Sequence, residues 1–214
     1  LGDSILESKN QAIRNLALVL AGTMLLYLSA KLKIPLDPVP FSMQTFVVLG
    51  LGMVYGWKLG VLTILAYILE GAIGLPVFAG TPEKGIGLID FTGPTMGYLI
   101  GFLFSSFIAG YLNFKTNILL IFLKLILSVS VIYILGILWL GNLIGWDKPI
   151  LQLGFFPFLL ADLFKILLLT FLTKKFFFSF SNSFQTTPVI FDFPKGTITK
   201  SPIFKFKLVS YVKG

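Results

Sequence analysis

Six long apolar segments, separated by short polar connections, dominate this sequence and limit the folds open to it. We place them at residues 12–32, 42–55, 59–78, 95–112, 117–143 and 150–172. Most approach or exceed the roughly 20 apolar residues that a helix needs to cross a bilayer. Backbone amides in lipid need partners within the chain, and these runs lack the two-residue alternation of a membrane β-barrel. The sequence therefore predicts an all-α integral membrane protein with six transmembrane helices.

Composition agrees with a membrane protein and removes several kinds of chemistry. Only 12% of the 214 residues are charged, against about 25% in soluble proteins, and 56% are hydrophobic. The sequence has no histidine and no cysteine, which excludes disulfides, cysteine nucleophiles, Ser-His triads and the usual zinc and haem ligands. We therefore predict no metal site and no bound cofactor. Catalysis would have to depend on Asp, Glu, Lys, Ser or Tyr.

The net charge of +8 is concentrated in the C-terminal tail and at the ends of the apolar segments. This distribution favours a membrane surface over nucleic acid as the partner, because basic flanks anchor membrane spans and attract anionic lipid. We divide the chain into an N-terminal flank at 1–11, a six-helix membrane domain at 12–172 and a basic, aromatic extension at 173–214. The extension is expected to lie at the membrane interface or to be poorly ordered.

An even number of spans places both termini on one side of the plasma membrane. With the termini in the cytoplasm, the inner flanks carry six basic residues, namely Lys9, Arg14, Lys58, Lys115, Lys174 and Lys175. The outer connections carry four, namely Lys31, Lys33, Lys84 and Lys148. Because basic residues are enriched in cytoplasmic loops, the count favours cytoplasmic termini by a small margin.

Asp162 and Lys165 stand inside the last apolar segment. A charge at membrane depth costs roughly 2.5–3.5 kcal/mol on insertion scales, so an acid and a base there need a reason. Residues three apart share a helical face, so the two side chains can neutralise each other and still offer a donor and an acceptor to a polar ligand. They form either a structural ion pair or part of a binding site.

The two connections predicted to face outward, at 31–41 and 79–94, are rich in glycine and proline. Proline fixes φ and glycine admits positive φ, so such loops hold compact shapes. Ordinary turn chemistry explains part of this composition. It explains less well why both loops fall on the same face, above the charged pair. We interpret them as a lid over a binding cavity.

Four motifs occur in order along the chain. They are Pro38-Val-Pro-Phe-Ser-Met-Gln-Thr45, Gly71-Ala-Ile-Gly-Leu-Pro-Val-Phe-Ala-Gly80, Thr92-Gly-Pro-Thr-Met-Gly-Tyr-Leu-Ile-Gly-Phe102, and Gly154-Phe-Phe-Pro-Phe158 followed by Asp162-Leu-Phe-Lys165. Together they resemble the BioY family, the biotin-binding substrate-specific components (S-components) of energy-coupling-factor (ECF) transporters, over residues 12–172.

The resemblance implies a six-helix S-component that captures biotin from outside, in a cavity capped by the first outer loop. Uptake would then require a scaffold transmembrane subunit and two ATPase subunits. The chain has no Gly-x-x-x-x-Gly-Lys-Ser/Thr phosphate loop, so any ATP hydrolysis must come from elsewhere.

Biotin offers two ureido N–H donors, one carbonyl acceptor and a largely apolar bicyclic body. Asp162 could accept from a ureido N–H, and Lys165 could donate to the carbonyl or the valerate, in charge-assisted bonds that strengthen away from water. Gln44 could add a donor and an acceptor at the cavity mouth, or it could anchor a loop. The other predicted binding residues are Gly80, in the second motif, and three aromatic residues that could pack on the thioether ring or belong to the core: Phe78, Tyr98 and Trp139.

Ala17 and Ala21 lie one turn apart in the first segment. This small-xxx-small spacing permits close helix approach. In S-components a comparable alanine motif on this helix docks the scaffold subunit, so the resemblance implies the same role here. Packing within the chain would need the same spacing.

Two alternatives to a shared transport machine stay open at this point. One is a self-sufficient secondary carrier for biotin or a related small molecule. The other, less favoured, is a membrane-embedded enzyme that uses Asp162 and Lys165 as acid and base. The sequence offers no histidine, no metal ligands and no nucleophile beside a base, so we expect that the protein is not an enzyme.

Overall fold

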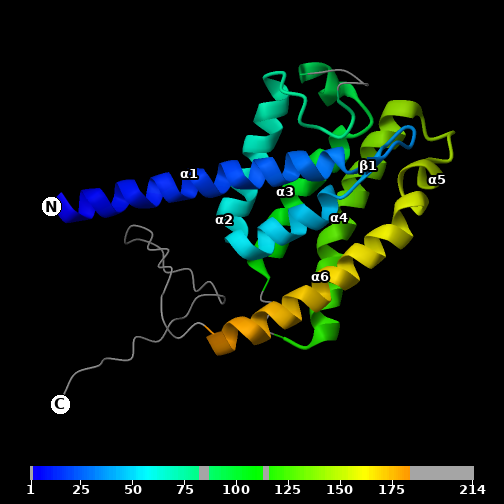
Figure 1. The fold of residues 1–214 in the computed structure, drawn as a ribbon. Helices are drawn as coiled ribbons and strands as arrows, with labels where there is room; N and C mark the ends of the chain where they lie inside the picture. The colour runs from blue at the N-terminus through cyan, green and yellow to red at the C-terminus, as the bar shows by residue number, and fades with distance from the viewer. Residues whose placement is uncertain (1, 82–86, 113–115, 184–214) are drawn as a thin grey trace, which may run out of the picture.

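The computed structural model describes residues 2–81, 87–112 and 116–183, and the chain is mostly helical there (Figure 1). Its long helices are α1 (Gly2–Lys31), α2 (Gln44–Ala72), α3 (Met96–Tyr111), α4 (Ile118–Ile144) and α6 (Phe156–Ser183). Its short elements are β1 (Lys33–Ile34), β2 (Phe41–Ser42), the 3-10 helix η1 (Gly87–Thr92) and α5 (Ile150–Gly154). Within the described ranges, α1, α2 and α4 each contain a stretch long and apolar enough to cross a membrane, and so does Ile150–Lys175, which combines α5 with most of α6. Helix α3 is a shorter apolar helix. The predicted helical membrane fold is confirmed.

Helix α2 contains two of the six predicted segments, joined at a break. Gly56 lies inside it with φ 75° and ψ 169°, which is outside the helical region and outside the backbone range that side-chain-bearing residues prefer. The two arms of α2 consequently point in different directions (Figure 1). The predicted segments at 42–55 and 59–78 fall on either side of this break.

Other boundaries differ from those predicted. The second arm of α2 ends at Ala72 rather than at residue 78, because Gly74 takes φ 96° and Pro76 cannot continue a helix. The last segment divides into α5 and α6 around Phe155, with Pro157 in the first turn of α6, where proline is tolerated.

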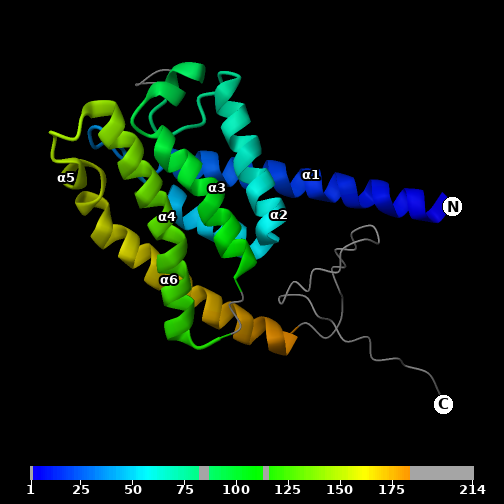
Figure 2. The ribbon, with the colours of Figure 1, turned by 180° about the vertical axis from the view of Figure 1, so that it is seen from behind.

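Both ends of the helical region extend past the predicted membrane domain. Helix α1 already begins at Gly2, inside the predicted flank, and α6 continues to Ser183, inside the predicted extension. The blue end of α1 projects well beyond the bundle (Figures 1 and 2). The rest of the predicted extension, from residue 184 onward, lies outside the described residues.

Helix α3 lies between α2 and α4 and packs closely on both (Figure 2). On the side facing α4, a Cβ at Gly101 would come within 2.7 Å of the Ile132 backbone. On the side facing α2, a Cβ at Gly52 would come within 2.6 Å of the Ser106 carbonyl oxygen. Small residues permit such backbone approach in membranes, where the hydrophobic effect adds little to helix association. These seams hold α3 at the centre of the bundle.

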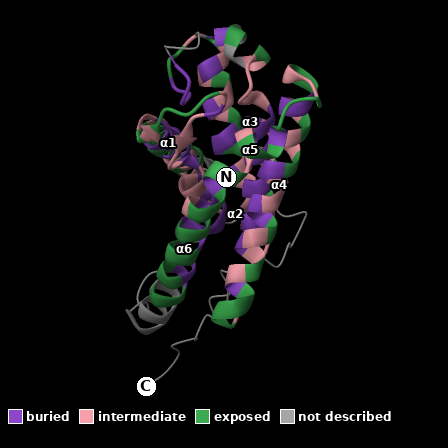
Figure 3. Ribbon diagram, turned by 90° about the vertical axis from the view of Figure 1, so that its right-hand side faces the viewer, coloured by how far each residue is buried: buried purple, intermediate pink, exposed green. Residues whose placement is uncertain are grey.

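The outer surface of the bundle is apolar, as a lipid-facing surface must be. Exposed residues follow the outer face of α6 (green in Figure 3). They include Leu160, 80% exposed, and Phe164, 68% exposed. Leu127 on α4 is 56% exposed. Large apolar patches of this kind are rare on soluble monomers and indicate contact with lipid or protein.

The seam between α2 and α3 predicts a difference between two glycines of the same helix. We expect Gly52→Ala to destabilise the protein by about 1–3 kcal/mol, because the added methyl meets the α3 backbone. Gly50 is the matched control, since a Cβ there meets nothing within 4 Å. Gly50→Ala should be neutral or stabilising by up to about 1 kcal/mol. Thermal unfolding of both variants in detergent tests this, and equal melting temperatures would contradict the packing described.

Candidate binding site

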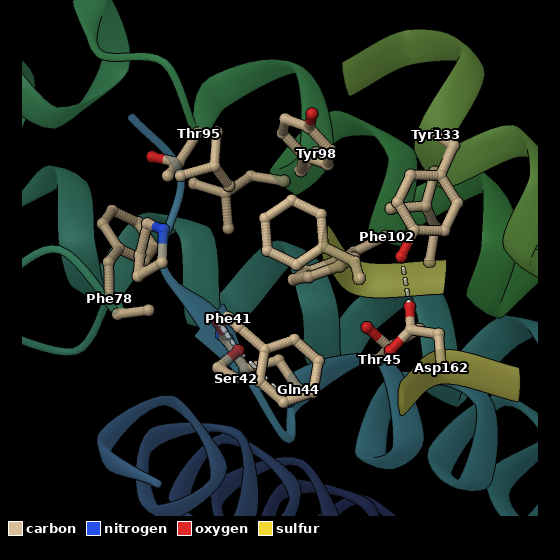
Figure 4. Close-up of a pocket in the computed structure, with 16 residues that line it drawn as sticks. Phe41, Ser42, Gln44, Thr45, Phe78, Thr95, Tyr98, Phe102, Tyr133 and Asp162 are labelled. Atoms are coloured by element: carbon tan, nitrogen blue, oxygen red, sulfur yellow. Dashed lines mark hydrogen bonds between the residues drawn. The ribbon is translucent and has the colours of Figure 1, made fainter. Parts of the chain in front are cut away.

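A cavity of about 60 Å³ opens among residues from five parts of the chain (Figure 4). The segment around β2 and the start of α2 form one wall, and Phe78 and Ala79 form another. Helix α3 contributes side chains between Thr95 and Phe102. Ile132 and Tyr133 of α4 and Phe158 and Asp162 of α6 complete the lining. Both glycine- and proline-rich connections thus reach the cavity that holds Asp162, as the lid interpretation predicted.

Asp162 and Lys165 form the predicted ion pair, and both are almost completely buried. The Lys165 Nζ lies 2.7 Å from Asp162 Oδ1, and the two residues are 3% and 5% exposed. The Tyr133 hydroxyl donates to the other carboxylate oxygen, Oδ2, at 2.6 Å (Figure 4). An ionised carboxylate has about four acceptor positions, so each oxygen of Asp162 keeps capacity for a further donor. The carboxylate is held from two sides and still faces the cavity.

Lys165 is directed toward the hairpin formed by β1 and β2, whose residues Phe41 and Ser42 line the cavity. Its Nζ donates to the Ser42 carbonyl oxygen at 2.6 Å and lies 3.9 Å from the centroid of the Phe41 ring. The Phe41 ring also stacks on Phe158 of α6, with ring centroids 6.0 Å apart. Lys165 is not among the residues that line the cavity. Its ammonium joins α6 to the hairpin through one hydrogen bond, to Ser42, and a cation–π contact with Phe41.

Gln44 lines the cavity, and its amide is already engaged on both sides. Its Nε2 donates to the Tyr67 hydroxyl at 2.8 Å, and that hydroxyl donates to the Val77 carbonyl oxygen at 2.8 Å. Its Oε1 accepts from the Ser42 hydroxyl at 3.1 Å. This network connects β2 and the start of α2 to the segment that follows α2. The geometry therefore fits the loop-anchoring alternative for Gln44.

Two of the three predicted aromatic residues line the cavity. Phe78 packs edge-on against Tyr67, with ring centroids 5.4 Å apart. Tyr98 lines the opposite wall and donates its hydroxyl to the Gly154 carbonyl oxygen at 2.8 Å. Trp139 is not in the lining; its Nε1 donates to the Gly93 carbonyl oxygen at 2.9 Å. Gly80 also lies outside the lining, although its neighbour Ala79 is part of it.

Two lysines fix the second lid segment in place. Lys31, at the end of α1, donates to the Thr81 carbonyl oxygen at 2.9 Å and to the Phe78 carbonyl oxygen at 3.3 Å. Lys33 in β1 donates to the Ala79 carbonyl oxygen at 2.7 Å. These are the lysines that weakened the charge count for cytoplasmic termini. Their contacts within the chain give both lysines a structural role that does not depend on the orientation in the membrane.

With this geometry described, the chain can be compared with known proteins. The BioY family model matches residues 6–182. This chain belongs to the BioY family. The probable biotin transporter BioY of Pyrococcus horikoshii is 37% identical over 152 residues, covering 71% of this chain and 89% of the relative. The biotin transporter BioY of Thermotoga maritima is 39% identical over 145 residues, covering 67% of this chain and 84% of the relative.

A solved structure supports the same relationship. The 2.1 Å crystal structure of the S-component for biotin from an ECF-type ABC transporter is similar to this chain with a TM-score of 0.66. The sequences are 26% identical, and the similarity covers 78% of this chain and 92% of the other. The BioY resemblance and the S-component fold predicted from the motifs are confirmed.

Sequence reasoning missed Tyr133 in this BioY protein. The residue lies in an apolar helix and carries the only side chain besides Lys165 that bonds Asp162 among the described residues. A signal was present, because a tyrosine hydroxyl buried at membrane depth needs a partner. That partner could not be named from sequence, since 29 residues separate Tyr133 from Asp162. Phe41 and Ser42 were noticed only as part of the first motif.

The buried ion pair predicts a non-additive stability effect. Lys165→Met should destabilise this BioY protein by about 3–5 kcal/mol, because it leaves the Asp162 carboxylate buried without its counter-ion. Adding Asp162→Asn should recover part of that loss, since no uncompensated charge remains. Melting temperatures of the two single variants and the double variant in detergent measure the coupling. Strictly additive losses would mean that the two charges do not compensate each other.

Proposed function

We propose that this protein is the substrate-binding subunit of a biotin uptake system in the plasma membrane. The observation that carries the proposal is the Asp162 carboxylate, which is 5% exposed, held by two donors and directed into a cavity between two lid segments. Its family membership supports biotin as the ligand, because the relatives described above are named as biotin transporters.

The cavity suits a ligand with a small polar head and an apolar body. Asp162 has acceptor capacity for a ureido N–H, and the low dielectric around it strengthens such a bond. Phe41, Phe102 and Phe158 surround this polar spot with apolar surface. We propose that Asp162 contacts biotin directly. Lys165 then acts as a positioning residue, because its donors already hold Asp162 and Ser42.

Biotin binding requires the cavity to enlarge. A volume of about 60 Å³ accommodates only a few water molecules, since one water needs about 10–15 Å³ by this measure. The hairpin formed by β1 and β2 is the wall that we propose moves. It is paired at only two positions, Lys33 with Ser42 and Ile34 with Phe41. It is connected to α6 by the Lys165–Ser42 bond and by the contacts of Phe41 with Lys165 and Phe158.

We propose that energy for uptake comes from partner subunits that dock on α1. Ala17 and Ala21 are both exposed on this helix, so they are not used for packing within the chain. A smooth face of this kind lets another helix approach closely. The partners would be the scaffold transmembrane subunit and two ATPase subunits. Both termini would then lie in the cytoplasm, as the basic residues at the inner flanks favour.

The alternatives considered from the sequence are less well supported. Asp162 and Lys165 are engaged with each other, Tyr133 and Ser42, which leaves neither poised to move a proton to a substrate. The named relatives are transporters rather than enzymes. A self-sufficient carrier is distinguished from a shared machine by the docking experiment described below.

Direct binding tests the ligand assignment. Titration of the detergent-purified protein with biotin, followed by calorimetry, should show binding that weakens roughly 10- to 100-fold in Asp162→Asn, the loss expected for one hydrogen bond to a charged group. Glu70→Gln is the matched control, because it makes the same chemical change outside the cavity lining. Unchanged affinity in Asp162→Asn, or no biotin binding by the wild type, would refute the assignment.

The proposed docking face consists of Ala17 and Ala21 on α1. Measuring biotin binding and biotin uptake separately tests this face. Ala17→Leu/Ala21→Leu should retain biotin affinity but abolish uptake of labelled biotin in cells that supply the scaffold and ATPase subunits, because bulky side chains keep the partner helix away. Ala12→Leu is the control, since Ala12 is exposed on a different face of α1. Undiminished uptake by the double variant, or uptake by wild type without those subunits, would contradict a shared machine.

A further inference from the structure

A second, larger hollow lies between α4 and α6, next to the cavity. We call it the α4–α6 groove; its volume is about 440 Å³. Its walls include Ser130, Ile134 and Ile137 of α4, and Leu159, Leu163 and Ile166 of α6. Tyr133 and Asp162 line both the groove and the cavity, so their hydrogen-bonded pair is a shared wall.

The polar side chains that line the groove are hydrogen-bonded within the protein. The Ser130 hydroxyl donates back to the Ile126 carbonyl oxygen at 2.8 Å. The Tyr133 hydroxyl donates to Asp162, and the carboxylate also accepts from Lys165. The remaining lining is aliphatic or aromatic. Water would find few partners in such a space, and apolar cavities in proteins stay dry and bind hydrocarbon.

The position of the groove places hydrocarbon beside it. Both walls belong to helices that are long and apolar enough to cross a membrane, and the α4 wall falls near the middle of Ile118–Ile144. At its rim, Ile134 is 56% exposed and Leu159 is 45% exposed. The groove is therefore continuous with the apolar outer surface of the bundle, at the depth of the acyl chains.

The shape of the wall favours a thin, flexible occupant over a helix. Close helix docking uses small residues one turn apart. Ser130 is the only small residue among the described residues that line the groove, and its neighbours one turn away, Ile126 and Ile134, are both large. The exposed alanine pair on α1 offers a helix a smoother face. We propose that the α4–α6 groove is a binding site for one acyl chain of a membrane lipid, which packs against the outer side of the Tyr133–Asp162 wall.

Photolabelling of the full chain in lipid nanodiscs tests this site. The probe is a phosphatidylcholine with a diazirine at the middle of one acyl chain, present as a trace component, with labelled positions read by mass spectrometry. Ile134 and Leu127 on α4 are both 56% exposed, but only Ile134 lines the groove. A bound chain should label Ile134 several-fold more than Leu127, and should also reach Ile166, which is only 5% exposed.

A groove-filling variant provides the second arm. Ser130→Phe should reduce labelling of the groove positions, whereas Leu127→Phe, outside the groove, should leave it unchanged. Labelling that follows exposure alone, with equal yield at Ile134 and Leu127, would overturn the proposal even if Ser130→Phe failed to fold. Protein–protein crosslinks at the groove in place of lipid adducts would assign the groove to a partner helix and overturn it as well. Neither arm uses biotin, so the result is independent of the proposed function.

Discussion

The rest of the candidate site depends on the ion pair and hydrogen bond that hold the Asp162 carboxylate. A buried carboxylate is tolerated only when it is paired and hydrogen-bonded, and Lys165 and Tyr133 meet that need from two helices. Lys165 then extends the network to the Ser42 carbonyl oxygen. One charged group thus fixes the positions of α4, α6 and the hairpin relative to one another. The packing of α3 between α2 and α4 stabilises the same arrangement.

The Tyr133–Asp162 pair also separates two environments of different polarity. On one side lies the small cavity, where Gln44, Thr45 and Ser42 provide polar atoms. On the other lies the apolar α4–α6 groove, whose polar groups all have partners. The 2.6 Å hydrogen bond from the Tyr133 hydroxyl to Asp162 Oδ2 lies between the cavity and the groove. The carboxylate can be buried at membrane depth because one of its oxygens accepts from Tyr133 and the other from Lys165.

The sequence predicted those features that depend on local spacing. Asp162 and Lys165 were found because two opposite charges three residues apart in an apolar run must share a helical face. The lid segments were found because proline and glycine mark fixed turns. The direction of Lys165 could not be predicted, because its partner Ser42 is 123 residues away. The same limit applies to Tyr133 and to Trp139, whose ring nitrogen bonds Gly93 outside the cavity lining. The break at Gly56 depends on one backbone angle that sequence alone does not specify.

The bond between Lys165 and Ser42 has a consequence for how the protein is made. Ser42 is synthesised 123 residues before Lys165, which lies on α6, the last long helix of the described residues. Contacts between such distant positions form only after the intervening chain has been placed. The Ser42 carbonyl oxygen of the hairpin therefore has no ammonium partner until α6 has been inserted. A nascent chain that stops before α6 holds most of the bundle but lacks both charges of the candidate site, Asp162 and Lys165.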